Sequence, residues 1–254
     1  LDNRGVLTRG IVPDWAQMIT CGVDVQQNCL YYAVDAWGQG KKIYPLDHGC
    51  IKGTDFNTLW DIINQTYYNE KGQDWYIDLA LIDSGDQTDL VYDFCYLHFP
   101  LTVPVKGSSR PIPARFRRSE IQKEDSVAKG LSLIMCDGSY YKSMLYAKIN
   151  AVDGSFQVFD GVDQEYCEQV TSEHKVFERK NGVESWVWQK KTSDAQNHYL
   201  DCEGYASCAA DLMGAFALLE EPVEQPEPEF QPEPEEDSWE EDTWDNDDWE
   251  DDWD

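Results

Sequence analysis

The chain has 254 residues and a formal charge of −29, from 49 acidic and 20 basic side chains. Residues 220–254 hold 19 of the acidic side chains and no Lys or Arg, so residues 1–219 carry only −10. No apolar run approaches the roughly 18 residues of a membrane helix, and no signal peptide opens the chain, which argues against a membrane or secreted protein. We expect a cytosolic protein whose first 219 residues are long enough to bury a core.

The first half of the chain predicts a meander of strands followed by alternating helices and strands. Two apolar runs separated by Gln26-Gln27-Asn28 predict a hairpin. Thr54 offers an N-cap to the first helix, and the continuous apolar run 79–83 is typical of a parallel strand buried on both faces. The predicted strands cover 18–25, 30–37, 43–51, 79–83 and 101–105, and the predicted helices cover 56–67 and 90–97.

The second half predicts a Gly-, Ser-, Pro- and Arg-rich loop over 106–118, then mixed elements. The predicted strands cover 131–136, 156–159, 174–179 and 184–188, and the predicted helices cover 140–149 and 193–219. The last helix is rich in Ala and Cys, and such small residues would let it lie close against a sheet. The fold class is therefore α/β, with an antiparallel three-strand meander plus parallel strands in one mixed sheet, flanked by helices.

Eight cysteines show no Cys-x-x-Cys spacing and lie in apolar segments. The spacing favours buried free thiols over a disulfide framework or a zinc site.

Three carboxylates occupy positions where a metal site could form. Asp24 and Asp83 each end a predicted strand, and Asp201 lies in the first half of the last helix. If the two strands pair in parallel, Asp24 and Asp83 lie side by side at the sheet edge where α/β proteins bind ligands. Such hard oxygen ligands suit Mg²⁺ or Mn²⁺. Two ions about 3.5–4 Å apart would support phosphodiester hydrolysis. Taken singly, each Asp is also compatible with a turn, cap or surface residue.

Seven sequence blocks follow one another along the chain. They are Pro13-x-Trp15, Thr20-Cys21-Gly22-Val23-Asp24-Val25-Gln26, Trp37-Gly38-x-Gly40, Ile82-Asp83-Ser84-Gly85, Val91-Tyr92-Asp93-Phe94-Cys95, Val105-Lys106-Gly107 and Asn197-x-x-Leu200-Asp201-Cys202. Their order resembles the nuclease domain of the lambda-type terminase large subunits of tailed bacteriophages. The pairing of Gly-Val-Asp-Val-Gln with a downstream Ile-Asp-Ser-Gly is the most specific part.

The resemblance implies a ribonuclease H-like fold that cuts concatemeric double-stranded viral DNA during genome packaging in the host cell cytoplasm. It implies that Asp24, Asp83 and Asp201 are the catalytic residues and bind two Mg²⁺ or Mn²⁺ ions. The implied partners are the terminase ATPase domain, the small terminase subunit and the portal. No Gly-x-x-x-x-Gly-Lys-[Ser/Thr] phosphate loop occurs in the chain. We therefore expect 1–14 to be a linker from an N-terminal ATPase domain and 15–219 to be the nuclease domain.

Four further polar residues are auxiliary candidates for the same site: Asp86, Asp137, Asn197 and His198. Asp86 and Asp137 could be additional ligands, although helix caps or turns explain them equally simply. Asn197 shares a helical face with Asp201 and could hydrogen-bond its carboxylate. His198, one helical turn before Asp201, could orient a water or contact the scissile phosphate, or could be structural.

A run of basic residues follows the fifth predicted strand: Lys106, Arg110, Arg115, Arg117 and Arg118, with no acidic residue between them. Because the rest of the domain is net negative, we expect this loop to grip DNA phosphates independently of sequence. Lys190 and Lys191 could extend the same surface. An ordinary solvated loop is the alternative.

Residues 220–254 predict a disordered acidic tail, because they contain too little apolar surface to offset the entropy of ordering. Trp239, Trp244, Trp249 and Trp253 stand at regular spacing among Asp and Glu. We expect this tail to bind a protein partner such as the portal, or to occupy the basic loop as a mimic of DNA charge. A tail that only confers solubility is the alternative.

The leading hypothesis is therefore a divalent-metal-dependent endodeoxyribonuclease domain. Two alternatives remain: another ribonuclease H-like nuclease, such as a resolvase or transposase core, and a non-catalytic docking module of the packaging motor.

Overall fold

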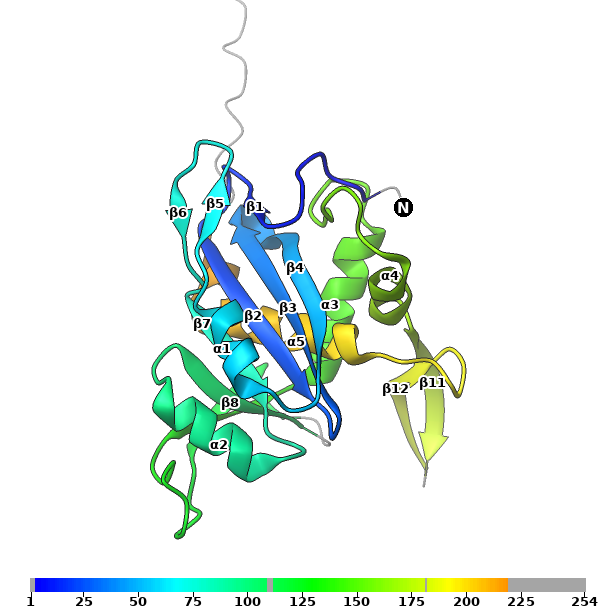
Figure 1. Cartoon of the computed structure of the whole chain (residues 1–254). Helices are drawn as coiled ribbons and strands as arrows, with labels where there is room; N and C mark the ends of the chain where they lie inside the picture. Colours follow the sequence, from blue (N-terminus) through cyan, green and yellow to red (C-terminus); the bar gives the residue numbers. More distant parts are fainter. Residues whose placement is uncertain (1–2, 109–111, 181, 219–254) are drawn as a thin grey trace, which may run out of the picture. The chain divides into compact units, whose positions relative to one another are not determined.

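The computed structural model describes residues 3–108, 112–180 and 182–218 (Figure 1). The strands are β1 (Ile11–Val12), β2 (Met18–Val25), β3 (Cys29–Gly38), β4 (Lys42–Lys52), β5 (Tyr67–Asn69), β6 (Asp74–Trp75), β7 (Leu79–Asp83), β8 (Thr102–Gly107), β9 (Phe116–Glu120), β10 (Ser132–Cys136), β11 (Glu173–Lys180) and β12 (Val183–Lys190). The helices are α1 (Phe56–Ile63), α2 (Thr88–Leu97), α3 (Gly138–Asn150), α4 (Gln164–Val170) and α5 (His198–Leu212), with the short 3₁₀ helices η1 (Gln39–Lys41) and η2 (Ala215–Ala217). The predicted tail, 220–254, lies outside the described residues.

Seven strands form one mixed sheet in the order β4-β3-β2-β7-β8-β10-β9. The β2, β3 and β4 strands pair antiparallel, as the predicted meander requires. The β2–β7, β7–β8 and β8–β10 pairs are parallel, and β9 closes the edge antiparallel to β10. The predicted mixed α/β fold is confirmed.

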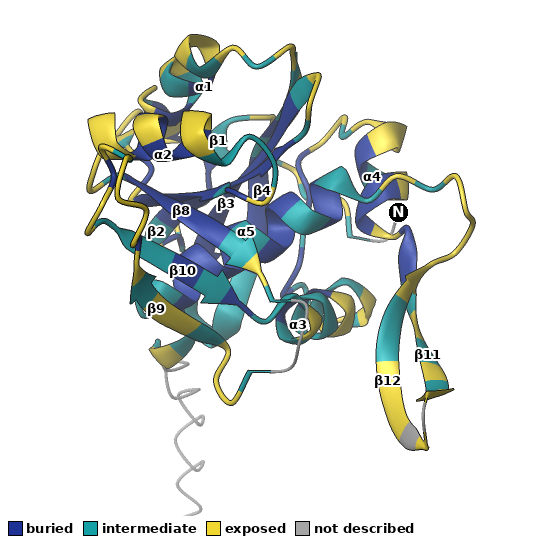
Figure 2. Cartoon of the chain, turned by 90° about the horizontal axis from the view of Figure 1, so that it is seen from below, coloured by how far each residue is buried: buried dark blue, intermediate teal, exposed yellow. Residues whose placement is uncertain are grey.

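Helices cover both faces of this sheet. The apolar residues of α1 and α2 pack in one core with Val23 and its same-face neighbours in β2. The α5 and α3 helices pack on the other face (Figure 2). There, Leu81 of β7 lies in one apolar core with Cys208 and Ala209 of α5. Strand alternation therefore separates the two cores, and it turns Gly22 and Asp24 toward α5.

The α5 helix lies very close to β2. A Cβ atom on Gly22 would stand 1.9 Å from the carbonyl oxygen of Cys202 and 2.5 Å from the amide nitrogen of Ala206. The Thr20 hydroxyl donates a hydrogen bond of 2.8 Å to the carbonyl oxygen of Ala206. The predicted close packing of the last helix on a sheet is thus observed, and it depends on the absence of a side chain at Gly22.

Several predicted boundaries were wrong. Asp55, not Thr54, caps α1, because its carboxylate accepts hydrogen bonds from two amides of the first turn. The predicted loop 106–118 contains the start of β9, which finds its partner in β10, and 156–159 makes only isolated bridges. The last helix ends at Leu212, before Gly214 at φ +91°. Cys50 is exposed, contrary to the prediction of buried thiols, whereas five other cysteines are buried.

Part of the predicted linker also contacts the domain. Val12 is fully buried, and β1 pairs in parallel with β5 in a small second sheet with β6. Burial of this apolar side chain gives residues 11–12 a fixed place beside the domain. Within the part of the chain that the structure describes, no helix has the length and apolar character to span a membrane.

Candidate functional site

Asp24 and Asp83 stand at the carboxyl ends of two neighbouring parallel strands. The register pairs Val23 with Ile82, one residue before each carboxylate, so the two residues end strands that lie about 4.8 Å apart. Asp24 is 3% exposed. Asp201 belongs to the first turn of α5, which crosses the same face next to Gly22. The parallel pairing predicted from sequence therefore brings these three residues to one edge of the sheet.

Asp83 is a carboxylate in an unfavourable environment for its charge. The pKa of Asp83 is raised to about 7, mainly by burial and also by the negative charges of Asp24 and Asp201, while a hydrogen bond from the Gly85 amide and the charge of Lys106 oppose the rise. The Gly85 amide donates at 3.0 Å to Oδ1 of Asp83. A cation bound here would relieve this electrostatic penalty.

Asp24 is held by two polar neighbours. The side-chain nitrogen Nε2 of Gln26 donates to both carboxylate oxygens of Asp24, at 3.0 and 2.9 Å. The Nδ1 atom of His198 lies 2.8 Å from Asp24 Oδ2, and its ring stacks on Tyr31 at 4.4 Å between centroids. His198 thus joins α5 to the end of β2, which places it among the site residues.

Asp201 is held by a second network. Lys142 Nζ on α3 lies 2.9 Å from Asp201 Oδ1 and 2.8 Å from Glu173 Oε1. The side-chain nitrogen Nδ2 of Asn197 donates to Asp201 Oδ2 at 2.9 Å and to Glu173 Oε1 at 2.7 Å. The predicted Asn197–Asp201 hydrogen bond is therefore present, and Glu173 joins the base of β11 to the same cluster.

Opposing effects act on the charge of this network. Burial raises the pKa of Asp201, while the charge and hydrogen bond of Lys142 act to lower it. Burial lowers the pKa of Lys142, but Asp201 and Glu173 outweigh this and leave it above its ordinary value. Lys142 is therefore held as an ammonium ion and supplies the counter-charge of the two acids.

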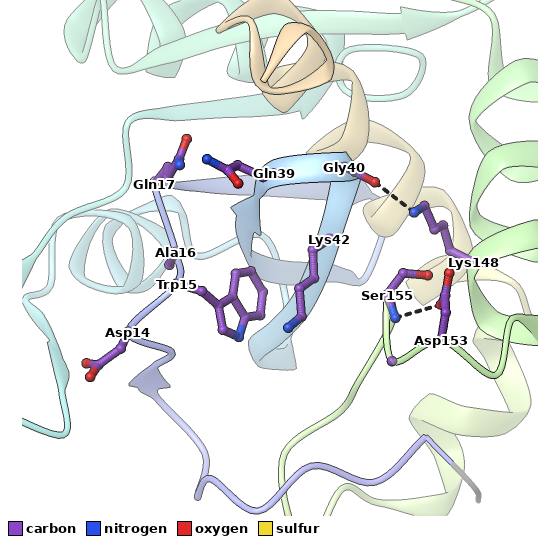
Figure 3. A pocket seen from close by; sticks show the side chains of 11 residues that line it. Asp14, Trp15, Ala16, Gln17, Gln39, Gly40, Lys42, Lys148, Asp153 and Ser155 are labelled. Atoms are coloured by element: carbon purple, nitrogen blue, oxygen red, sulfur yellow. Dashed lines mark hydrogen bonds between the residues drawn. The ribbon is translucent and has the colours of Figure 1, made fainter. Parts of the chain in front are cut away.

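A cavity of about 700 Å³ opens beside Asp201. Lys142 and Asp137 line it together with the hairpin residues Glu173 of β11 and 185–188 of β12. A second cavity of about 790 Å³ lies at the opposite end of β2, where Lys42 lies over the Trp15 ring and Lys148 donates to the carbonyl oxygen of Gly40 (Figure 3). The three carboxylates do not line this second cavity.

The other acidic candidates have local structural contacts. Asp137 caps α3 by accepting hydrogen bonds from the Ser139 and Tyr140 amides at 3.0 and 3.2 Å, and it also lines the cavity beside Asp201. Asp86 accepts a hydrogen bond from the Gln87 amide at 2.8 Å, within its own turn. Asp137 therefore acts as a helix cap and Asp86 as a turn residue, as the alternatives predicted from the sequence describe.

The basic residues predicted to bind DNA are found in different settings. Lys106 is the residue before the last in β8 and its charge acts on Asp83, whereas Arg117 and Arg118 are exposed on β9. Arg115 instead pairs with Asp211 of α5, with Nε 2.7 Å from Oδ2. Arg110 lies outside the described residues. Arg117 and Arg118 are therefore exposed cations on the edge strand β9, and the DNA-binding role of the run stays a prediction.

Among residues 3–108, 112–180 and 182–218, no three His, Cys, Asp or Glu side chains are grouped so that they could hold a metal ion. In the structure, Asp24 directs Oδ2 to His198 and Asp201 directs Oδ1 to Lys142. The donor chemistry suits a hard divalent cation. The metal-binding role of the three carboxylates stays a prediction.

Three residues of the site were not predicted: Gln26, Lys142 and Glu173. Gln26 is the last residue of the sequence block that begins at Thr20, but no role in the site was predicted for it. Lys142 and Glu173 are 59 and 28 residues from Asp201 in the chain, and no local spacing relates them to it.

The chain matches the family model of the terminase large subunit gpA, endonuclease domain, over residues 2–218. It belongs to this family. No curated protein and no solved structure matches the chain. The family confirms the resemblance seen in the sequence blocks and assigns the terminase endonuclease domain a nuclease role in phage DNA packaging. Nuclease domains of this family imply dependence on a divalent metal in general.

Proposed function

We propose that this domain is a divalent-metal-dependent endodeoxyribonuclease that cuts concatemeric double-stranded viral DNA during packaging. The observation that carries the proposal is the meeting of Asp24 and Asp83 at parallel strand ends with Asp201 of α5 on the same face. The raised pKa of Asp83 adds to it, because it marks a carboxylate that lacks sufficient counter-charge.

Asp24, Asp83 and Asp201 would hold Mg²⁺ or Mn²⁺, and a pair of such ions supplies Lewis-acid stabilisation of the attacking and leaving oxygens in phosphodiester hydrolysis. The remaining residues position these ligands. Asn197 orients Asp201, while Gln26 orients Asp24. Lys142 supplies positive charge to Asp201, and His198 contacts Asp24. These two contacts would have to move aside for a metal ion to bind both carboxylates.

DNA binding would come from exposed basic residues outside the acidic centre. Arg117 and Arg118 lie on the edge strand β9 and carry the charge to contact phosphates without reading sequence. Targeting would then depend on partners, for which we propose the terminase ATPase domain, the small subunit and the portal. The acidic tail remains a proposed contact for a protein partner or for the basic run.

The test is nicking of supercoiled plasmid by the 254-residue chain. We expect nicking in Mn²⁺ or Mg²⁺, loss of nicking in excess EDTA, and recovery when the metal is restored, because the carboxylates need a divalent cation to act on a phosphodiester. Gel separation of supercoiled, nicked and linear forms measures the rate. Undiminished cutting in EDTA would rule out the metal mechanism.

Asp83→Asn is expected to make the metal-free protein more stable at pH 8, by about 1 kcal/mol. The folded-state pKa of Asp83 is near 7, above its ordinary value. The ionised Asp83 carboxylate therefore destabilises the folded state by an amount that grows from about pH 4 to pH 7 and is constant at higher pH. Asparagine removes the charge and can still accept the Gly85 hydrogen bond. Urea unfolding at pH 4 and pH 8 measures the difference.

Mn²⁺ is expected to raise the melting temperature of the wild-type chain. In Asp83→Asn most of this rise should be lost, because the substitution removes one metal ligand. Asp153→Asn is the matched control, since Asp153 is exposed at the other cavity and accepts a hydrogen bond from the Ser155 amide that asparagine can keep. A full Mn²⁺ shift in Asp83→Asn would contradict its role as a ligand.

A further inference from the structure

The β11–β12 hairpin exposes two large aromatic side chains on one face. The register places Phe177 directly opposite Trp186, and their rings meet edge to face at 5.3 Å. Phe177 is 54% exposed and Trp186 is 62% exposed. Figure 2 shows the hairpin projecting from the part of the domain that holds the main sheet, with an exposed section of β12. An exposed aromatic pair on a projecting hairpin points to a binding surface.

The aromatic face borders the cavity beside Asp201. Trp186 and Trp188 alternate onto the same side of β12, and both line that cavity together with Asp201. Trp188 is held at the base of the hairpin, where its ring meets Tyr146 at 5.8 Å and its indole nitrogen donates to Ser143 at 3.4 Å. The outer aromatic pair therefore extends a wall that begins at the candidate active site.

The base of the hairpin is tied to the catalytic carboxylate itself. Glu173 opens β11 and accepts hydrogen bonds from Lys142 and Asn197, which both also contact Asp201. Lys175 reaches Ser143 of α3 at 2.9 Å. A ligand held on the aromatic face is thus held at a defined place relative to Asp201.

The charge of the hairpin suits a nucleic acid. Residues 173–191 contain five Lys or Arg and three Glu, a net charge of +2, in a domain whose residues 1–219 carry −10. Glu173 is paired with Lys142, and Glu184 is paired with Arg179, which leaves the lysines of the hairpin without an acidic partner among these two acids. Positive charge around exposed aromatic rings is the combination that binds single-stranded nucleic acid, since the cations hold phosphates and the rings stack on bases.

We infer that Phe177 and Trp186 form a stacking platform for unpaired nucleotides of a DNA strand that enters the cavity beside Asp201. In a fully paired duplex, each base is covered by its neighbours, so its face is closed to an indole ring. The platform would therefore favour DNA that is locally unpaired next to the cut. This inference rests on the proposed nuclease function and names the form of its substrate.

The test compares two fluorescein-labelled DNA probes in EDTA, so that no cleavage occurs. One is a fully paired duplex, and the other is the same duplex with a central stretch of unpaired bases. Fluorescence anisotropy with the 254-residue chain measures both affinities. We expect the wild-type chain to bind the unpaired probe more tightly. The double variant Phe177→Ala/Trp186→Ala should lose about tenfold to a hundredfold in affinity for that probe and about twofold or less for the duplex.

Three further variants make the result specific. Trp186→Phe keeps an aromatic ring and should retain most of the affinity for the unpaired probe. Tyr96→Ala removes a 56% exposed aromatic on α2, away from the hairpin, and should change neither affinity. Arg117→Ala/Arg118→Ala should weaken both probes to a similar degree and reduce the dependence of binding on salt.

Failure of the inference is distinguishable from failure of the proposed function. Equal wild-type affinities for the two probes, or unchanged binding of the unpaired probe by the double variant, would overturn the stacking platform and assign the aromatic pair to another kind of partner, such as a protein. Metal-dependent plasmid nicking would stand in that case. Absence of nicking together with absence of binding to both probes would overturn both proposals.

Discussion

Asp24→Asn and Asp201→Asn are each expected to slow plasmid nicking in Mn²⁺ by at least ~10³-fold, about 4 kcal/mol of transition-state stabilisation. Both substitutions keep the shape of the side chain and replace an anionic ligand by a neutral amide. Asp24 is 3% exposed beside Gln26 and His198, and Asp201 lies between Lys142 and Asn197. Loss of the negative charge removes the attraction for a divalent cation, while the amide oxygen of the new asparagine can keep a contact with one donor of each carboxylate, Lys142 or Asn197 at position 201 and Gln26 or His198 at position 24.

The measurement is the initial rate of conversion of supercoiled to nicked plasmid, with the melting temperature of each variant recorded alongside. Asp153→Asn should nick at the wild-type rate, because Asp153 is at the far cavity. Binding of both variants to duplex DNA should stay within about threefold of wild type, since phosphate contacts come from basic side chains elsewhere. Wild-type nicking by both variants would refute the assignment of the site.

Gly22→Ala is expected to lower the free energy of unfolding by about 3 kcal/mol. The added Cβ would lie 1.9 Å from the carbonyl oxygen of Cys202 and 2.5 Å from the amide nitrogen of Ala206. Both atoms belong to the backbone of α5, so no side-chain rotation relieves the overlap. The helix must move away from β2, and Asp201 moves with it. We therefore expect nicking to be lost together with stability.

Gly204→Ala is the matched control within the same helix. A Cβ atom at Gly204 meets no atom within 4 Å outside its local helical backbone, so the substitution should stabilise the protein by about 0.5–1 kcal/mol through a higher helix propensity. Urea unfolding of both variants, monitored by circular dichroism, measures the two changes. A Gly22→Ala protein as stable as wild type would show that α5 does not depend on close approach to β2.

The predicted elements match the structure best where the pattern is local and strong. The run 18–25 with Asp24, and the run 79–83 with Asp83, are strands with these bounds, because apolar continuity and β-branched residues mark buried strands directly. The strand β9 was missed because Arg117 and Arg118 resemble a solvated loop when their partner strand β10 is unknown. The predicted strand 156–159 failed for the converse reason, since an apolar stretch can be buried without pairing along its length.

The sequence by itself determined the main-sheet strands and the helices between them from residue 18 to residue 105, the two carboxylates at strand ends, and the resemblance to the family. The strands, helices and strand-end carboxylates follow from periodicity and composition over a few neighbouring residues, and the resemblance follows from the seven sequence blocks and their order. Only the tertiary structure decided that Lys142 and Glu173 hold Asp201, that His198 contacts Asp24, and that the aromatic hairpin borders the cavity. Such contacts join segments that are far apart in the chain, and they depend on how closely α5 can approach β2 at Gly22, which only the packed fold sets.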